Sequence, residues 1–172
     1  MTKSEIQQEE YNEYYTGYLN LIDDNTELID GYYQGKKMME NFISSIPDKK
    51  YTYRYQPEKW SISEVIQHLI DTERVFMYRC FRIARNDKTE LAGFDQDDYI
   101  VPSEANSKTK EQLLEEFTSN RNSSISLLKS LSEKNLGFVG NANGGPVSAR
   151  AAAFIVLGHD MHHSNIIKER YL

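Results

Sequence analysis

The segment from Ser61 to Ala84 constrains the fold of this chain more than any other. It opens with Ser61-Ile62-Ser63-Glu64, a capping box in which the serine hydroxyl and the glutamate carboxylate satisfy free backbone donors at a helix start. Apolar residues then recur at steps of three and four residues, namely Ile62, Val65, Ile66, Leu69, Phe76, Met77, Cys80, Phe81 and Ile83. This pattern predicts a long amphipathic helix that buries one face.

Three further segments have the same periodicity. One runs from about Asn25 to Ser45 and is ended by Pro47. A second capping box, Thr109-Lys110-Glu111-Gln112, opens a helix that continues to about Leu131. Pro146 suits the first turn of a last helix. Four amphipathic helices without convincing strands predict an all-α four-helix bundle.

The segments between these helices differ in character. Residues 48–60 are expected to form an extended connection, and residues 135–145, rich in glycine and asparagine, a loop. Residues 86–106 form a long acidic connection between the second and third helices, and connections of this length are usually functional or span a bundle. Residues 1–20 are acidic and rich in tyrosine, so we expect an arm or a short helix before a single domain over 21–172.

Charge and composition exclude several classes of function. A net charge of −6 disfavours nucleic acid as the ligand, because phosphate neutralisation needs clustered Lys and Arg. No apolar run approaches the roughly 18 residues of a membrane span. The first residues lack an apolar core after a basic start, so the cytoplasm is the expected location. The lone cysteine, Cys80, fits a reducing compartment and lies on the core stripe of its helix.

Three of the four histidines lie within five residues of the last helix. His159 and His163 are four residues apart, which separates them by about 6 Å along a helix and about 40° around it. With His68 from a facing helix they would supply three metal ligands and leave a position for water, as in catalytic metal sites.

Each histidine also has an ordinary interpretation. A single histidine on a helix is usually packed or hydrogen-bonded, and a pair at this spacing also arises by chance on an exposed face. His162 could reach the same ion. We favour His163 because it aligns with Val156 and Ile167, which leaves His162 beside the ligands.

Other polar residues are candidates for supporting roles. Asp71, one turn after His68, is a candidate catalytic base or acceptor of a histidine N–H, although a solvated carboxylate is the alternative. Acidic and aromatic residues of the long connection either line the mouth of the site or form an ordinary surface loop: Asp95, Asp97, Asp98 and Tyr99. A row of arginines either meets an anionic substrate or forms surface ion pairs: Arg79, Arg82 and Arg85. Trp60 is assigned to packing at the helix start.

Four short motifs occur in order along these helices: Lys59-Trp60-Ser61, His68-Leu69-Ile70-Asp71-Thr72-Glu73, Gly93-Phe94-Asp95 and Gly158-His159-Asp160-Met161-His162-His163. Together they resemble the DinB superfamily over roughly residues 20–172, and within it the YfiT-like branch of metal-dependent hydrolases and bacillithiol S-transferase-like proteins. The resemblance implies a divalent metal, zinc or nickel in different members, held by His68, His159 and His163. It also implies a homodimer, for which the tyrosine-rich arm is a candidate contact.

The chemistry expected from such a site depends on its open position. A divalent ion there lowers the pKa of water toward about 7 or deprotonates a thiol. The chain is therefore expected to be a metal-dependent enzyme that transfers a low-molecular-weight thiol to an electrophile or hydrolyses a small-molecule substrate. The alternative is a stress-related metal-binding bundle without catalytic turnover.

Overall fold

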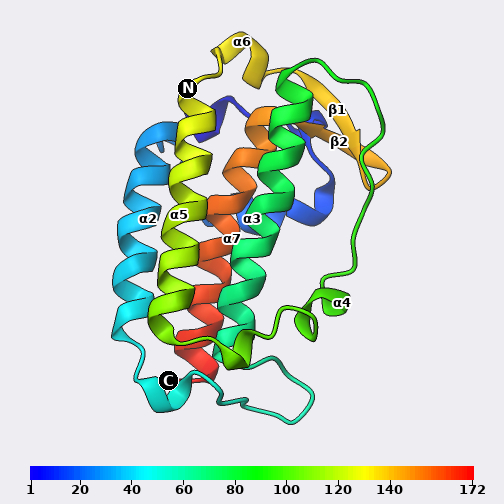
Figure 1. Cartoon of the computed structure of the whole chain (residues 1–172). Helices are drawn as coiled ribbons and strands as arrows, with labels where there is room; N and C mark the ends of the chain where they lie inside the picture. The colour runs from blue at the N-terminus through cyan, green and yellow to red at the C-terminus, as the bar shows by residue number, and fades with distance from the viewer.

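Four long helices build the molecule, and the computed structural model describes all of residues 1–172 (Figure 1). They are α2 (Leu28–Ser45), α3 (Ile62–Ala84), α5 (Lys110–Lys129) and α7 (Ala149–Arg170). The predicted all-α four-helix bundle is confirmed. None of these helices combines the length and apolar character that crossing a bilayer requires.

The order of the helices around the bundle differs from their order in the chain. Going round the bundle, α2 contacts α5, α5 contacts α3, α3 contacts α7, and α7 contacts α2. Figure 1 shows α2 and α7 running in one direction and α3 and α5 in the other. Because α3 and α5 are parallel, the connection over residues 85–109 returns along the length of the bundle, with α4 (Asp97–Ile100) and a 3-10 turn (Ala105–Ser107) on its way. This confirms the long connection that the sequence predicts.

Both predicted capping boxes are present. The Ser61 hydroxyl accepts a hydrogen bond from Glu64 N at 3.2 Å, and the Glu64 carboxylate accepts one from Ser61 N at 2.7 Å. Thr109 and Gln112 make the equivalent pair of bonds at the start of α5. Each box satisfies donors that a helix start leaves free, so α3 and α5 begin where the sequence places them.

A β-hairpin corrects the prediction of a loop over 135–145. After the short helix α6 (Glu133–Leu136), β1 (Val139–Ala142) pairs antiparallel with β2 (Gly145–Ser148), and Val139 faces Ser148. Asn143 and Gly144 form the turn with φ values of 54° and 75°. Positive φ at both central residues suits the twist of a two-residue hairpin, and Asn-Gly favours it.

The start of α7 is a second correction. Pro146 lies in β2 rather than in the first helical turn, and the helix begins at Ala149. The Ser148 side chain caps it by accepting a hydrogen bond from Ala151 N at 3.0 Å. A serine cap satisfies a free donor, which the proline two residues earlier has no side-chain acceptor to do.

Residues 1–20 fold against the bundle. They form 3-10 turns at Lys3–Glu5, Gln8–Glu10 and Glu13–Tyr15 and then α1 (Thr16–Leu19), which contacts α7. A Cβ atom on Gly158 would lie 2.2 Å from the carbonyl oxygen of Tyr18. Glycine at this position of α7 therefore permits the close approach of the arm.

The core consists of two apolar clusters. Tyr32 and Phe154 belong to the cluster nearer the hairpin, while Met39 and Phe117 belong to the cluster at the opposite end. The guanidinium of Arg121 lies 5.1 Å from the ring centres of both Tyr32 and Phe117, so a buried polar layer separates the clusters.

Candidate metal centre

Three histidine side chains converge between α3 and α7. Each offers one nitrogen, and these atoms of His68, His159 and His163 all lie within 4.8 Å of one another. The Nε2 atoms of His68 and His159 are 3.0 Å apart. The structure thus brings together the three residues that the sequence selects as candidate ligands.

Burial keeps these imidazoles neutral. It lowers the pKa of His68 to about 4. Burial, with smaller contributions from His68 and His162, lowers the pKa of His163 to about 3. The pKa of His159 is also well below its usual value, first because of burial and then because of the neighbouring histidines. The neutral form is the one that binds a metal ion.

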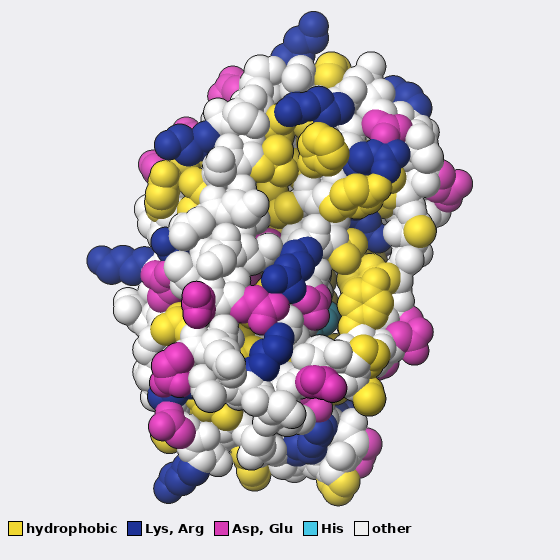
Figure 2. Space-filling model, viewed as in Figure 1, with side chains coloured by type: hydrophobic (Ala, Val, Ile, Leu, Met, Phe, Trp, Pro, Cys, Tyr) yellow, Lys and Arg dark blue, Asp and Glu magenta, His cyan; other side chains and the backbone are white.

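Aromatic rings pack against two of the three histidines. The Trp60 ring centre lies 4.8 Å from that of His68, and the Tyr18 ring centre lies 5.3 Å from that of His159. Trp60 therefore packs at the start of α3, as expected, and also covers one ligand candidate. Figure 2 shows histidine on this face only as a small recessed patch between acidic and apolar side chains.

Thr72 rather than Asp71 is the hydrogen-bond partner of His68. The Thr72 hydroxyl lies 3.3 Å from His68 Nδ1. The Asp71 carboxylate instead accepts hydrogen bonds from Gln67 Nε2 at 3.1 Å and from Arg74 Nη1 at 2.9 Å. If Nε2 of His68 carries the free lone pair, its Nδ1–H donates to Thr72, which fixes the ring. A catalytic role for Asp71 stays a prediction.

His162 lies outside the group of three. Its ring centre is 5.1 Å from that of Tyr18 and 5.0 Å from that of His163, with edge-to-face geometry in both cases. Burial lowers its pKa as well. His162 thus packs beside the candidate ligands, and its part in the site stays a prediction.

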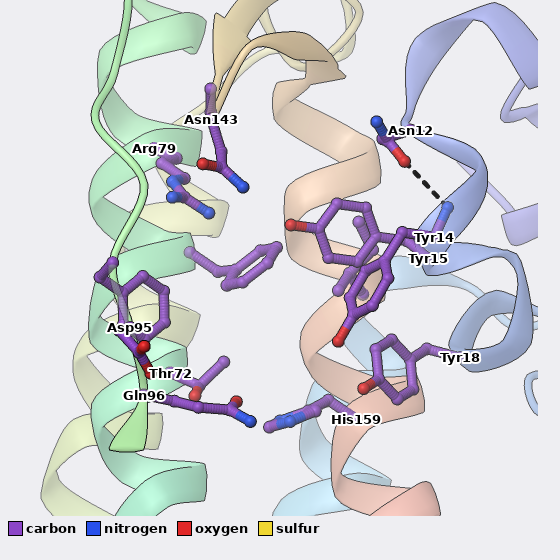
Figure 3. A pocket seen from close by; sticks show the side chains of 14 residues that line it. Asn12, Tyr14, Tyr15, Tyr18, Thr72, Arg79, Asp95, Gln96, Asn143 and His159 are labelled. Atoms are coloured by element: carbon purple, nitrogen blue, oxygen red, sulfur yellow. Dashed lines mark hydrogen bonds between the residues drawn. The ribbon is translucent and has the colours of Figure 1, made fainter. Parts of the chain in front are cut away.

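A cavity of about 460 Å³ reaches His159 and Thr72 (Figure 3). One wall comes from the arm, through Tyr14, Tyr15 and Tyr18. The opposite wall comes from α3 and the long connection, with residues Phe76, Arg79, Phe94, Asp95 and Gln96. The arm tyrosines, which the sequence offers as a candidate dimer contact, thus line the cavity of a single chain.

The long connection covers other sides of the histidines. Tyr99 and Gln96 line a narrow cavity beside His68. Asp97 lies with Trp60 and His163 at a separate cavity of about 280 Å³. The histidine group therefore borders cavities on more than one side.

The three arginines of the predicted row, two in α3 and one at its C-cap, separate into two groups. Arg79 is buried and lines the large cavity. Arg82 pairs with Asp87, and Arg85 lies over the Phe81 ring at 5.6 Å. Only Arg79 is therefore placed to meet a ligand in this cavity.

Cys80 lies in the core, as the sequence predicts. It is fully buried, and burial raises the pKa of its thiol to about 12. The thiol is therefore not poised to act as a nucleophile.

A buried ionic network, which sequence reasoning missed, lies beside the histidines. Arg121 donates to both carboxylate oxygens of Glu73, at 2.7 and 3.0 Å, and to Asp160 at 2.6 Å. Burial raises the pKa of Asp160 to about 6, against the lowering effect of Arg121. The available signal was a charged residue at a core-facing position on each of three helices.

The donor set fits a divalent ion. Neutral imidazoles suit borderline ions such as Zn²⁺ and Ni²⁺. A tetrahedral ion with bonds of about 2.0–2.1 Å separates its ligand atoms by about 3.4 Å. The observed separations, 3.0 Å for one pair and at most 4.8 Å for any pair, bracket that value, so small ring rotations suffice.

The sequence matches the family model of the DinB superfamily over residues 32–167. No curated protein matches it at a significant level. The matched range contains α3, the long connection and all three candidate ligands.

Solved structures share the fold. YfiT from Bacillus subtilis, described as a probable metal-dependent hydrolase with an unusual four-helix bundle topology, gives a TM-score of 0.72 at 15% identity, over 83% of this chain and 82% of that one. The DinB-like protein YjoA from Bacillus subtilis gives a TM-score of 0.59 at 15% identity, over 83% of this chain and 87% of that one.

A third similar structure is larger. The mycothiol-dependent maleylpyruvate isomerase gives a TM-score of 0.66 at 12% identity, over 80% of this chain and 58% of that one. Identities this low establish the fold alone. Because the family model covers most of the sequence, the chain belongs to the DinB superfamily.

Proposed function

We propose that this protein is a metal-dependent enzyme in which His68, His159 and His163 hold one divalent ion, zinc or nickel. The convergence of three imidazoles, two of them buried and His163 partly buried, beside a cavity that His159 lines is the observation that carries the proposal. The reaction we favour is transfer of a low-molecular-weight thiol to an electrophilic small molecule. Two reactants need two approaches, and His159 and His163 border different cavities.

Hydrolysis of a small substrate is the second candidate. The names of similar structures support both reactions, since one is described as a probable metal-dependent hydrolase and another depends on a thiol. A divalent ion, when bound, lowers the pKa of a water molecule or a thiol at its open position. Either substrate would then be activated at the same place.

The surrounding residues have separable tasks in this proposal. Thr72 holds the His68 ring in one orientation through Nδ1. Trp60 and Tyr18 cover the imidazoles and exclude bulk water, which strengthens electrostatic interactions inside the site. The large cavity holds the substrate beside His159.

Metal analysis of untagged protein tests the proposal. We expect about one equivalent of zinc or nickel in the wild type and a large loss in His68→Ala. His162→Ala is the matched control, because this histidine neighbours the group without belonging to it, and should keep the metal. Full metal content in His68→Ala would show that the ligand set is wrong.

Activity assays then separate the candidate functions. Metal-loaded protein is incubated with a thiol and an electrophile, or with small esters and amides. Turnover in the first assay alone supports thiol transfer, and turnover in the second alone supports hydrolysis. One bound equivalent without turnover in either assay would favour the alternative, a metal-binding protein without catalysis. The homodimer stays a prediction, which light scattering tests.

A further inference from the structure

Arg79 is a buried cation without a carboxylate partner. The residue is only 3% exposed. Its one hydrogen bond is donated by Nη2 to the carbonyl oxygen of Ala92 at 2.9 Å. The rings of Phe76 and Phe94 lie 5.2 and 5.7 Å from its guanidinium carbon. By contrast, the fully buried Arg121 binds two carboxylates. A buried charge is costly unless it is paired, and Arg79 has donors left to pair with an anionic ligand in the cavity.

The cavity connects Arg79 with the histidines. Thr72, Phe76 and Arg79 line it from α3 at steps of four and three residues, which places them on one face of the helix. Figure 3 shows Arg79 and Asn143 at one end of the cavity and His159 at the other. The guanidinium lies near Phe76, eight residues from His68, or roughly 12 Å along the helix. A ligand that touches both ends must therefore be elongated.

Amide groups surround the Arg79 end. Asn143 from the hairpin turn and Asn12 from the arm also line the cavity. A Cβ atom on Gly93 would lie 2.0 Å from Asn143 Oδ1, so glycine at position 93 allows this side chain to pack against the long connection. Leu91 bonds to the hairpin in both directions, through Asn141 O and Asn143 N at 2.9 Å each. The polar end is thus held by backbone pairing as well as by side chains.

We propose that Arg79 binds the carboxylate of an elongated substrate whose other end reacts at the histidine group. This proposal rests on the proposed function and specifies the class of substrate. The planar guanidinium matches a carboxylate, and its hydrogen bonds to an anion are stronger than neutral ones. Asp95 lines the same cavity, which favours a singly charged end group over a doubly charged one. Arg79 thereby determines specificity and takes no part in the chemical step.

A series of thiols of increasing length tests the assignment. Mercaptoalkanoic acids and mercaptoalkanols of equal length are titrated into Co²⁺-loaded protein, and the thiolate-to-metal absorption reports binding. We expect the acids to bind roughly 10- to 100-fold more tightly than the alcohols, with a maximum at an intermediate length. Arg79→Met should abolish the preference, and Arg79→Lys should retain part of it. Arg82→Met, on the outside of the same helix, should retain all of it.

A second measurement separates this proposal from the proposed function. Calorimetry of metal-free protein with octanoate and with octanamide tests the Arg79 end alone, and the wild type should prefer octanoate. A missing thiolate absorption with a retained octanoate preference would refute the metal site only. Equal binding of octanoate and octanamide, or an undiminished preference in Arg79→Met, would overturn the role of Arg79. Thermal unfolding and the Arg79→Lys variant show whether a loss reflects misfolding.

Discussion

Two buried polar groups lie side by side in this bundle and differ in how their charges and hydrogen bonds are satisfied. Arg121 is compensated inside the protein, because Glu73 and Asp160 accept its hydrogen bonds at 2.6 to 3.0 Å. The three histidines mainly face one another, with 3.0 Å between the Nε2 atoms of His68 and His159. Both groups connect α3 with α7, yet only the histidine group borders the large cavity, through His159.

The contrast distinguishes a polar cluster that joins helices from one that we propose binds a metal ion. An ionic network with paired charges joins helices and has little to offer a ligand, although Arg121 Nη1 has no hydrogen-bond partner. Converging nitrogen atoms that share few hydrogen bonds offer lone pairs to an ion. We therefore expect substitutions in the Arg121 network to change stability, and substitutions among the histidines to change metal binding.

The largest expected effect is that of Arg121→Met. Removing the cation leaves two carboxylates buried without compensation, so the free energy of unfolding should fall by about 3–5 kcal/mol in urea titrations. Arg74→Met is the matched control, because Arg74 also bonds two carboxylates, Asp71 and Glu116, but is exposed. The free energy of unfolding of Arg74→Met should fall by less than about 1 kcal/mol. Equal losses would erase the contrast between the buried network and a surface one.

Removal of metal should have the next largest effect. At a free metal concentration 100 times the dissociation constant, binding stabilises the fold by about 2.7 kcal/mol, and a chelator should remove this increment. Thermal unfolding with and without chelator measures it. The increment should vanish in His163→Ala and persist in His162→Ala. An increment retained in both variants would place the ion elsewhere.

Acid should destabilise the metal-free protein through the histidines. Burial lowers the pKa of His68 to about 4, whereas an unfolded imidazole takes up a proton near its usual pKa of about 6.5. The unfolded state therefore binds more protons between these values, and stability falls as the pH falls. At pH 5.5, one unit below the unfolded pKa, such a histidine lowers the free energy of unfolding by about 1.4 kcal/mol. His68→Phe should flatten the pH profile of unfolding, and parallel profiles would contradict this.

Thr72→Val should have the smallest effect. The substitution keeps the shape but removes the hydroxyl that lies 3.3 Å from His68 Nδ1. Metal affinity should fall about 10-fold, with a change in stability below about 1 kcal/mol. Thr118→Val, whose hydroxyl donates to Glu40 away from the histidines, is the control for losing a threonine hydroxyl. Unchanged affinity in Thr72→Val would make this contact incidental.

Local sequence signals predict the bundle well. The capping box at Ser61 and the apolar stripe after it place α3 correctly, because cap and periodicity are properties of a single helix. The spacing of His159 and His163 likewise predicts correctly that their side chains lie together, because both belong to one helix. Asn143-Gly144 is also a local signal, since this dipeptide favours a two-residue hairpin turn, but the glycine and asparagine around it favour a loop.

Contacts between distant segments were not predictable in this way. Arg121 lies between Phe117 and Ile125 on the buried face of α5, but the sequence does not show which residues pair with it, since Glu73 and Asp160 come from other helices. The choice of Thr72 over Asp71 beside His68 depends on the direction of the His68 side chain within α3, because residues three and four positions away are both within reach. The tyrosine wall depends on how the arm docks, which its own composition does not specify.

The docking of Tyr18 against Gly158 has a consequence for biosynthesis. The arm is synthesised before α7, yet both contribute to the cavity around His159. The tyrosines of a nascent chain therefore cannot dock until α7 has left the ribosome. The cavity is accordingly a part of the molecule that forms only after residues 149–170 have been made.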